Sequence, residues 1–269
     1  MGDMNLNNDM EFDPLESKPV SKKSMVIFFL VDTSGSMYGT KIGTLNTTME
    51  EIIPELRGVG GATTDIKLAV MSFSDGCKWV TPKPISIDEY KYWTRLKADG
   101  LTDMGEAFIE LSKKLSRKEF LKSPSLSYAP VIFLLTDGAP TDDARSGLKV
   151  LKNNKWYKYA MKISLGLGES YERDILEDFT GNEELVFAAK TSSELARIVK
   201  TIAVTSSQIG SKSITLVDND GKERMEEDVI GDKENKLADD INNSLKDDGV
   251  FEEDTEYVED FDIEDGWDE

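Results

Sequence analysis

Three long apolar runs stand out along the chain: "MVIFFLV" at 25–31, "IKLAVMSF" at 66–73 and "APVIFLLT" at 129–136. Each run is nearly continuous, whereas a strand with one wet face alternates apolar and polar residues. Continuous runs of this length are typical of strands buried on both faces of a sheet. Two weaker runs, at 160–168 and 185–189, are predicted as further strands.

Between these runs, apolar residues recur at spacings of three and four, which predicts helices. A first helix is predicted over 42–56 and a second after Met104. A third is predicted around 148–156, and a last one begins at the capping-box pair Thr191 and Glu194. Strands that alternate with helices predict an α/β fold with a doubly wound, mostly parallel sheet.

Charged residues are distributed unevenly along the chain, and this distribution sets the predicted domain boundaries. The formal net charge is −20, and residues 218–269 hold 23 acidic and 5 basic residues of the total. We therefore predict a polar N-terminal extension at 1–23, a globular domain at 24–210 and an acidic, largely disordered tail at 211–269. Within the domain, 75–87 breaks the alternation and is predicted to form a short edge strand or hairpin.

Composition excludes several classes of site. The chain has one cysteine, Cys77, and no histidine, which excludes an internal disulfide, a cysteine–histidine zinc site and histidine-based catalysis. A basic nucleic-acid footprint is absent, so nucleic acid is not an expected partner. The first 23 residues lack a signal-peptide pattern, and no apolar run reaches the roughly 20 residues that span a bilayer. We therefore expect a cytoplasmic protein without a membrane span.

Small polar residues follow two of the predicted central strands at the point where each strand ends. The first strand ends in Asp32, followed by Ser34 and Ser36, and the strand from Ala129 ends in Thr136-Asp137-Gly138. Ligands of parallel α/β sheets bind at the carboxyl ends of the strands, so these side chains are expected to converge. Two carboxylates and two hydroxyls without histidine or cysteine favour a hard cation held by oxygen atoms.

These residues resemble the metal-ion-dependent adhesion site of von Willebrand factor type A (VWA) domains. The family pattern is D-x-S-x-S after the first strand, a threonine in a later loop, and a T-D-G after a further strand; "ADGLTDMGEAF" supplies the threonine as Thr102. The resemblance covers about 24–210 and implies a doubly wound sheet with strand order 3-2-1-4-5-6. It also implies the metal ligands Asp32, Ser34, Ser36, Thr102 and Asp137.

The same resemblance implies a function. The ion is expected to be Mg²⁺, with Mn²⁺ or Ca²⁺ possible, and its open coordination position takes an Asp or Glu carboxylate from a partner protein. Within the family, the phrases "FFLVDTSGSM" and "VIFLLTDGAPTDD" resemble the stand-alone bacterial type found with tellurium-resistance genes. That type implies a role in a bacterial signalling or stress-response complex, with a protein kinase or phosphatase encoded nearby as partner.

Alternatives remain open at this point. The chain is expected not to be an enzyme, and the alternative is a metal-dependent phosphohydrolase that uses the two aspartates. The acidic tail is expected either to solubilise the protein, to dock on a basic partner surface, or to compete for its own metal site. Near the site, Lys41 is predicted to be a solvated residue of a first helical turn, with contact to the partner's carboxylate as the alternative. Asp103, Asp142 and Asp143 are predicted to start helices rather than bind metal.

Overall fold

A computed structural model describes residues 22–210, apart from 58, 60, 62, 63 and 124, and residues 226–247. Its centre is a seven-stranded sheet with the order β3-β2-β1-β5-β6-β7, in which the short β4 pairs with β2. The main strands are parallel and only β3 and β4 run antiparallel, so the predicted 3-2-1-4-5-6 order is confirmed when β4 is set aside. The strands are β1 (Lys23–Asp32), β2 (Thr64–Ser74), β3 (Gly76–Trp79), β4 (Ile85–Ser86), β5 (Val131–Thr136), β6 (Met161–Leu167) and β7 (Val186–Ala189).

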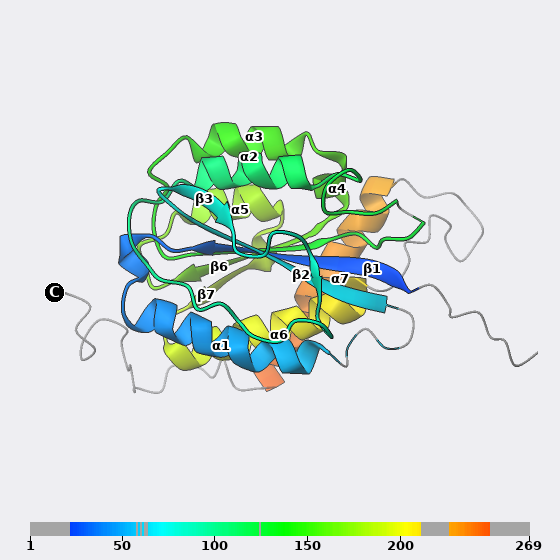
Figure 1. The fold of residues 1–269 in the computed structure, drawn as a ribbon, viewed down its shortest axis with the longest axis horizontal. Helices are drawn as coiled ribbons and strands as arrows, with labels where there is room; N and C mark the ends of the chain where they lie inside the picture. The colour runs from blue at the N-terminus through cyan, green and yellow to red at the C-terminus, as the bar shows by residue number, and fades with distance from the viewer. Residues whose placement is uncertain are drawn as a thin grey trace, which may run out of the picture.

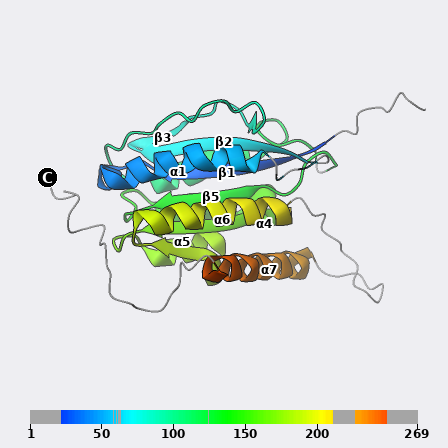
Figure 2. The same cartoon turned by 90° about the horizontal axis from the view of Figure 1, so that it is seen from below.

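Helices cover both faces of this sheet (Figure 1). One face carries α2 (Met104–Lys114), α3 (Ala144–Lys152), α4 (Lys155–Tyr159) and α5 (Arg173–Thr180). The other carries α1 (Thr40–Leu56) and α6 (Ser192–Gly210). α7 (Glu226–Asp247) packs against α6 and runs past the sheet toward α4 (Figure 1 and Figure 2). None of the helices in the described ranges is long and apolar enough to cross a membrane.

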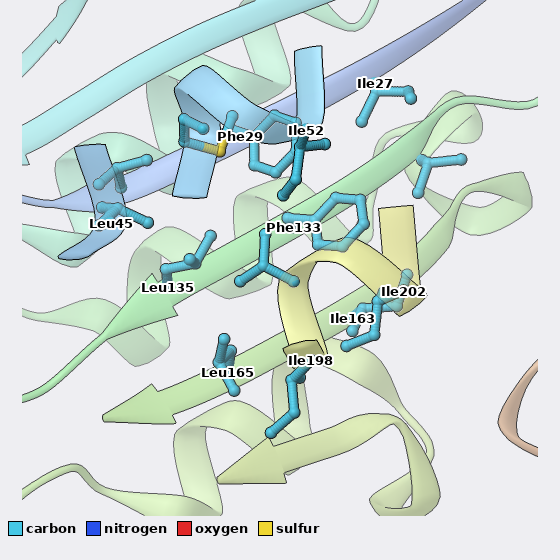
Figure 3. Close-up of a cluster of buried hydrophobic side chains, with 14 of the residues drawn as sticks. Ile27, Phe29, Leu45, Ile52, Phe133, Leu135, Ile163, Leu165, Ile198 and Ile202 are labelled. Carbon is cyan, nitrogen blue, oxygen red and sulfur yellow. The ribbon is translucent and has the colours of Figure 1, made fainter. Parts of the chain in front are cut away.

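The continuous apolar runs are explained by burial on both faces. In β1, Ile27 and Phe29 point into one core cluster, while Phe28 and Leu30 point into the other. Figure 3 shows the first cluster, where the Phe29 ring stacks on Phe133 of β5 at 4.8 Å between centroids. A strand held this way on both sides has a fixed register, which fixes the position of the residues at its carboxyl end.

The third predicted helix is in fact two. α3 ends at Lys152, and α4 begins after Asn154. The Asn154 side chain accepts hydrogen bonds from the Trp156 and Tyr157 amides and donates to the carbonyl oxygens of Ser112 and Leu115, at 2.8 and 3.1 Å. Because asparagine is a strong N-cap, it starts a new helix here, and it also ties that start to the end of α2.

The acidic segment contains an ordered helix, which corrects part of the expectation of disorder. α7 buries Leu237, Ala238, Ile241 and Leu245 completely against the first core cluster. These residues recur at spacings of three and four, so a narrow apolar stripe docks although the helix is rich in acids. Lys162 at the start of β6 also pairs with Glu234 of α7 at 2.7 Å. The rest of the expected tail, 211–225 and 248–269, lies outside the described residues.

α2 and α3 pack closely because glycine faces glycine. A Cβ added at Gly147 of α3 would lie 2.6 Å from the Cα of Gly105 in α2, well inside van der Waals contact. We expect Gly147→Ala to lower the free energy of unfolding by about 1–3 kcal/mol through overpacking. Urea denaturation measures this. Ser146→Ala, at an exposed position of the same helix, is the matched control, and equal midpoints for the two variants would contradict close packing as the reason for these glycines.

Candidate metal centre

The first part of the candidate site is built at the end of β1. Asp32 is its last residue, completely buried, and its Oδ1 accepts a hydrogen bond from the Ser34 amide at 2.8 Å. The chain then turns through a short 3-10 helix, Gly35–Met37. This turn places the Ser34 and Ser36 hydroxyl oxygens 3.1 Å apart. The D-x-S-x-S spacing therefore brings the two hydroxyls together, as the sequence predicts.

The second part comes from β5. This strand pairs with β1 in parallel, so the carboxyl ends of both strands lie at the same end of the sheet. Asp137 follows β5 directly, and its Oδ1 accepts a hydrogen bond from the Ser36 hydroxyl at 2.7 Å. Because that bond uses the single proton of Ser36, the Ser34 hydroxyl is the donor in the serine pair. Four of the five predicted residues thus form one connected hydrogen-bond network: Asp32, Ser34, Ser36 and Asp137.

Thr102 lies in a loop that is joined to the turn after β1. Two backbone hydrogen bonds join the loops, from the Gly35 amide to the Gly100 carbonyl at 2.9 Å and from the Asp99 amide to the Thr33 carbonyl at 2.8 Å. Thr102 itself is buried, its amide donates to the Thr141 hydroxyl, and its carbonyl accepts from the Thr141 amide. Among the described residues its hydroxyl has no hydrogen-bond partner, which leaves it available as a ligand.

Acidic residues beside the site hold its loops together. Asp142, which follows β5, accepts hydrogen bonds from the Gly105 and Glu106 amides and so caps α2, a helix to which it does not belong. Asp143 caps its own helix α3 through the Ser146 amide. The prediction that Asp142 starts its own helix is therefore corrected. The first amides of a helix have no partner within the helix, and the Asp142 carboxylate oxygens lie 2.8 and 2.9 Å from two such amides of α2. Asp142 therefore caps α2 instead of α3.

Lys41 is the main residue that the sequence places wrongly. The prediction is a solvated side chain, but only 12% of it is exposed and its Nζ lies 3.1 Å from Oδ2 of Asp137. Its position one residue into α1 turns the side chain back over the site. An ammonium group therefore already neutralises one carboxylate of the cluster.

Asp32 has a shifted pKa. Burial raises the pKa of this carboxyl to about 6 from the usual 3.8, against the lowering effect of hydrogen bonds from Thr136 and Ser34. The Thr136 hydroxyl donates to Oδ2 of Asp32 at 2.5 Å, so both carboxylate oxygens accept a hydrogen bond. A buried carboxylate next to a second one, Asp137, is the arrangement that a divalent cation stabilises.

The donor set fits a hard cation. The candidate ligands are two carboxylates and three hydroxyls, and hard cations such as Mg²⁺ take oxygen ligands. Among the described residues, no three acidic, cysteine or histidine side chains gather closely enough to hold a metal by themselves. A site with two carboxylates therefore depends on its hydroxyls for the remaining ligands. The ammonium of Lys41 on Asp137 further shows that the cluster accommodates positive charge.

The family follows from comparison with known sequences. The profile of the von Willebrand factor type A domain matches residues 27–201. This chain belongs to that family. The matched range runs from within β1 into α6 and contains all five candidate ligands, so the VWA domain is the unit that carries the site.

Curated relatives of this VWA domain are inter-alpha-trypsin inhibitor heavy chains. Heavy chain H4 from Sus scrofa is 31% identical over 134 residues, covering 47% of this chain and 14% of the relative. Heavy chain H6 from Homo sapiens is 29% identical over 165 residues, covering 57% and 12%. This chain thus spans about an eighth of the length of these relatives. The predicted likeness to the tellurium-resistance type is not found among them.

Solved structures share the VWA fold. Proximal thread matrix protein 1 from the mussel byssus, with a zinc-occupied MIDAS motif, has a TM-score of 0.51 at 19% identity and covers 70% of this chain and 47% of its own. A von Willebrand factor type A structure from Catenulispora acidiphila has a TM-score of 0.50 at 19% identity, covering 70% and 43%. At this identity the likeness shows the fold alone.

Proposed function

We propose that the VWA domain is a metal-dependent protein-binding module. Mg²⁺ is held by Asp32, Ser34, Ser36, Thr102 and Asp137, and an Asp or Glu side chain of a partner protein completes its coordination. The observation that carries this proposal is the hydrogen-bond chain from Ser34 through Ser36 to Asp137. It gathers oxygen donors from two strand ends at one point.

The charges explain why the ion would take an external anion. The cluster holds two carboxylates and the ammonium of Lys41, a formal charge of −1 when all are ionised. A divalent cation therefore brings the site to +1. Because the remaining donors are neutral hydroxyls, the bound ion keeps a net attraction for a carboxylate from outside. Mn²⁺ and Ca²⁺ share the preference for oxygen ligands and suit the same donors.

The contacts of Asp32 favour binding over catalysis. A nucleophilic or general-base carboxylate must be able to approach the substrate, whereas a metal ligand can stay fixed and offer a remaining lone pair. Both oxygens of Asp32 accept hydrogen bonds from Ser34 and Thr136. This supports a positioning role at the metal rather than the phosphohydrolase alternative.

The finer proposal is a role inside a bacterial cell, in a signalling or stress-response complex of the tellurium-resistance type. The phrases "FFLVDTSGSM" and "VIFLLTDGAPTDD" are what supports it. A protein kinase or phosphatase encoded nearby is then the partner to test first, as the source of the carboxylate.

The test pairs metal binding with partner capture. In Ser34→Ala/Ser36→Ala we expect the rise in melting temperature on adding MgCl₂ to disappear, and capture of partner protein in Mg²⁺ to fall to the level seen in EDTA. Differential scanning fluorimetry and affinity capture measure the two effects. Ser123→Ala/Ser125→Ala is the matched control, because it removes another serine pair with hydroxyls 3.0 Å apart, away from the site. Capture that persists undiminished in EDTA contradicts the proposal.

A further inference from the structure

A basic pocket lies at the end of the sheet where the parallel strands begin, opposite the candidate metal centre. It encloses about 590 Å³ between α4, the end of α5, the start of β6 and α7. In Figure 1 this is the right-hand side, where β1 begins and where α4 and the first part of α7 come together. We call it the lysine pocket, after four of the residues that line it: Lys152, Lys155, Lys158 and Lys162.

Two of these lysines lie beside an acid of the lining and two do not. Lys162 pairs with Glu234 at 2.7 Å, and Lys152 lies 3.6 Å from Asp178, which also pairs with Arg145 at 2.9 Å. Glu234 and Asp178 are the two acids of the lining. Lys155 and Lys158 are exposed and form no ion pair with any residue that the structure describes. The pocket therefore carries two uncompensated positive charges in a chain whose net charge is −20.

Two aromatic side chains, Tyr157 and Phe179, form the floor of the pocket and are almost completely buried. Tyr157 and Phe179 contact edge to face at 5.8 Å between ring centroids, and the Lys162 ammonium lies 5.6 Å from the Tyr157 ring. The exposed side chains above this floor are Lys152, Lys155 and Lys158, so the accessible surface suits a negatively charged ligand.

We propose that residues 248–269 of this chain dock in the lysine pocket. This segment holds 12 acidic residues and no basic one, with Phe251, Tyr257, Phe261 and Trp267 spaced among them. Its acids complement Lys155 and Lys158. The inference does not depend on the proposed function of the metal centre.

The segment is long enough to reach the pocket. It follows α7, which lines the pocket with Gly231 and Glu234 and ends at Asp247. From Glu234 to Asp247 the helix rises only about 20 Å. An extended chain of the length of 248–269 spans up to about 70 Å, so it can fold back along α7 and still fill the pocket. Attachment to α7 also gives it a local concentration on the order of millimolar, which suits weak surface ion pairs.

The metal centre is a poorer site for the same segment. Its rim carries exposed carboxylates at Asp75 and Asp99 beside the Thr102 loop, and at Glu169 just after β6. A segment with 12 acids meets repulsion there and attraction at the opposite end of the sheet. The structure thus favours the lysine pocket over self-competition for the metal.

Carbodiimide cross-linking of the full chain tests the proposal, because it joins a lysine amine to a carboxylate in direct contact. We expect cross-links from 248–269 to Lys155 and Lys158 at roughly fivefold or more the yield seen at Lys83 and Lys91. These two lysines are exposed and lie between β3 and β4 and just after β4, at the edge of the sheet away from β6 and β7. The yield should fall between about 0.05 M and about 0.5 M salt. A mixture of ¹⁴N- and ¹⁵N-labelled protein shows whether the link lies within one chain. Equal yields at all four lysines, links between chains, or links to the metal-centre loops overturn the proposal.

A second measurement uses charge reversal. Lys155→Glu/Lys158→Glu should release the segment and raise the rate at which a glutamate-specific protease cuts within 248–269 by about fivefold or more. Lys83→Glu/Lys91→Glu makes the same change of charge away from the pocket and should leave the rate unchanged. Equal rates for the two variants overturn the proposal, and both variants are at exposed positions, so folding is not at stake.

Discussion

Asp32→Asn is expected to abolish most divalent-cation binding while leaving the metal-free protein folded and more stable than the wild type. The ion loses a charged ligand, so we expect its affinity to fall by at least about 100-fold. The stability gain has a separate cause, since burial raises the pKa of the Asp32 carboxyl to about 6. Titration calorimetry with Mg²⁺ or Mn²⁺ and urea denaturation without metal measure the two effects.

The stability gain expected for metal-free Asp32→Asn depends on pH, because the Asp32 carboxyl of the wild type titrates. Below about pH 3.8 the carboxyl is neutral in both folded and unfolded chains and costs nothing. Between about pH 4 and 6 the unfolded chain ionises first, so a penalty on folding grows; above pH 6 it is complete, at about 3 kcal/mol. The amide of the Asp32→Asn variant carries no such penalty, so the stability advantage of the variant should shrink as the pH falls from 7 to 4.

Asp143→Asn, at an exposed helix cap, is the control for metal binding. Two results contradict this account: a metal affinity of Asp32→Asn equal to that of the wild type, or a gain in its free energy of unfolding over the wild type that is smaller at pH 7 than at pH 4.

Ile241→Ala is expected to destabilise the whole domain although it lies outside the range that the family profile matches. Ile241 of α7 is completely buried in the core cluster shared with α1 and α6. Large-to-small substitution at such a position costs about 2–5 kcal/mol. The measurement is urea denaturation followed by far-ultraviolet circular dichroism.

The control for α7 lies two residues away. Asn243→Ala changes an exposed position of the same helix and should alter the free energy of unfolding by less than about 0.5 kcal/mol. If Ile241→Ala behaved like this control, α7 would not be part of the cooperative core. The lysine pocket, which α7 helps to line, would then also lose its support.

The sheet was predictable because its strands are buried on both faces. All five predicted runs became β1, β2, β5, β6 and β7, and 75–87 supplied the edge strands β3 and β4. α7 was not predicted because net charge is an unreliable signal for disorder when a helix keeps an apolar face. Its apolar stripe of Leu237, Ile241 and Leu245 recurs every four residues and was the signal that could have found it. A helix needs only one apolar face to pack against a core, so even a narrow stripe is sufficient.

The candidate site was predictable where sequence neighbours or strand ends bring residues together. Asp32, Ser34 and Ser36 lie in one turn, and Asp137 follows from the pairing of β1 with β5. The contact of Lys41 with Asp137 was missed, since a long flexible side chain can turn toward solvent or back over the site. Only the packing of α1 against the sheet decides between these positions. The crossed cap of Asp142 was missed for a similar reason, because it joins two helices that are far apart in sequence.

That crossed cap has a consequence for how this chain can change over evolution. Asp142 belongs to the loop after β5, yet it caps the first turn of α2, which follows the candidate ligand Thr102 in the chain. A single-residue insertion in 138–141 would carry Asp142 away from the Gly105 and Glu106 amides and loosen both loops at once. The segment between α2 and β5 carries no such crossed cap among its described residues. Length variation in homologous chains should therefore gather at 116–130, and the short loop at 138–141 should keep its length even where its residues differ.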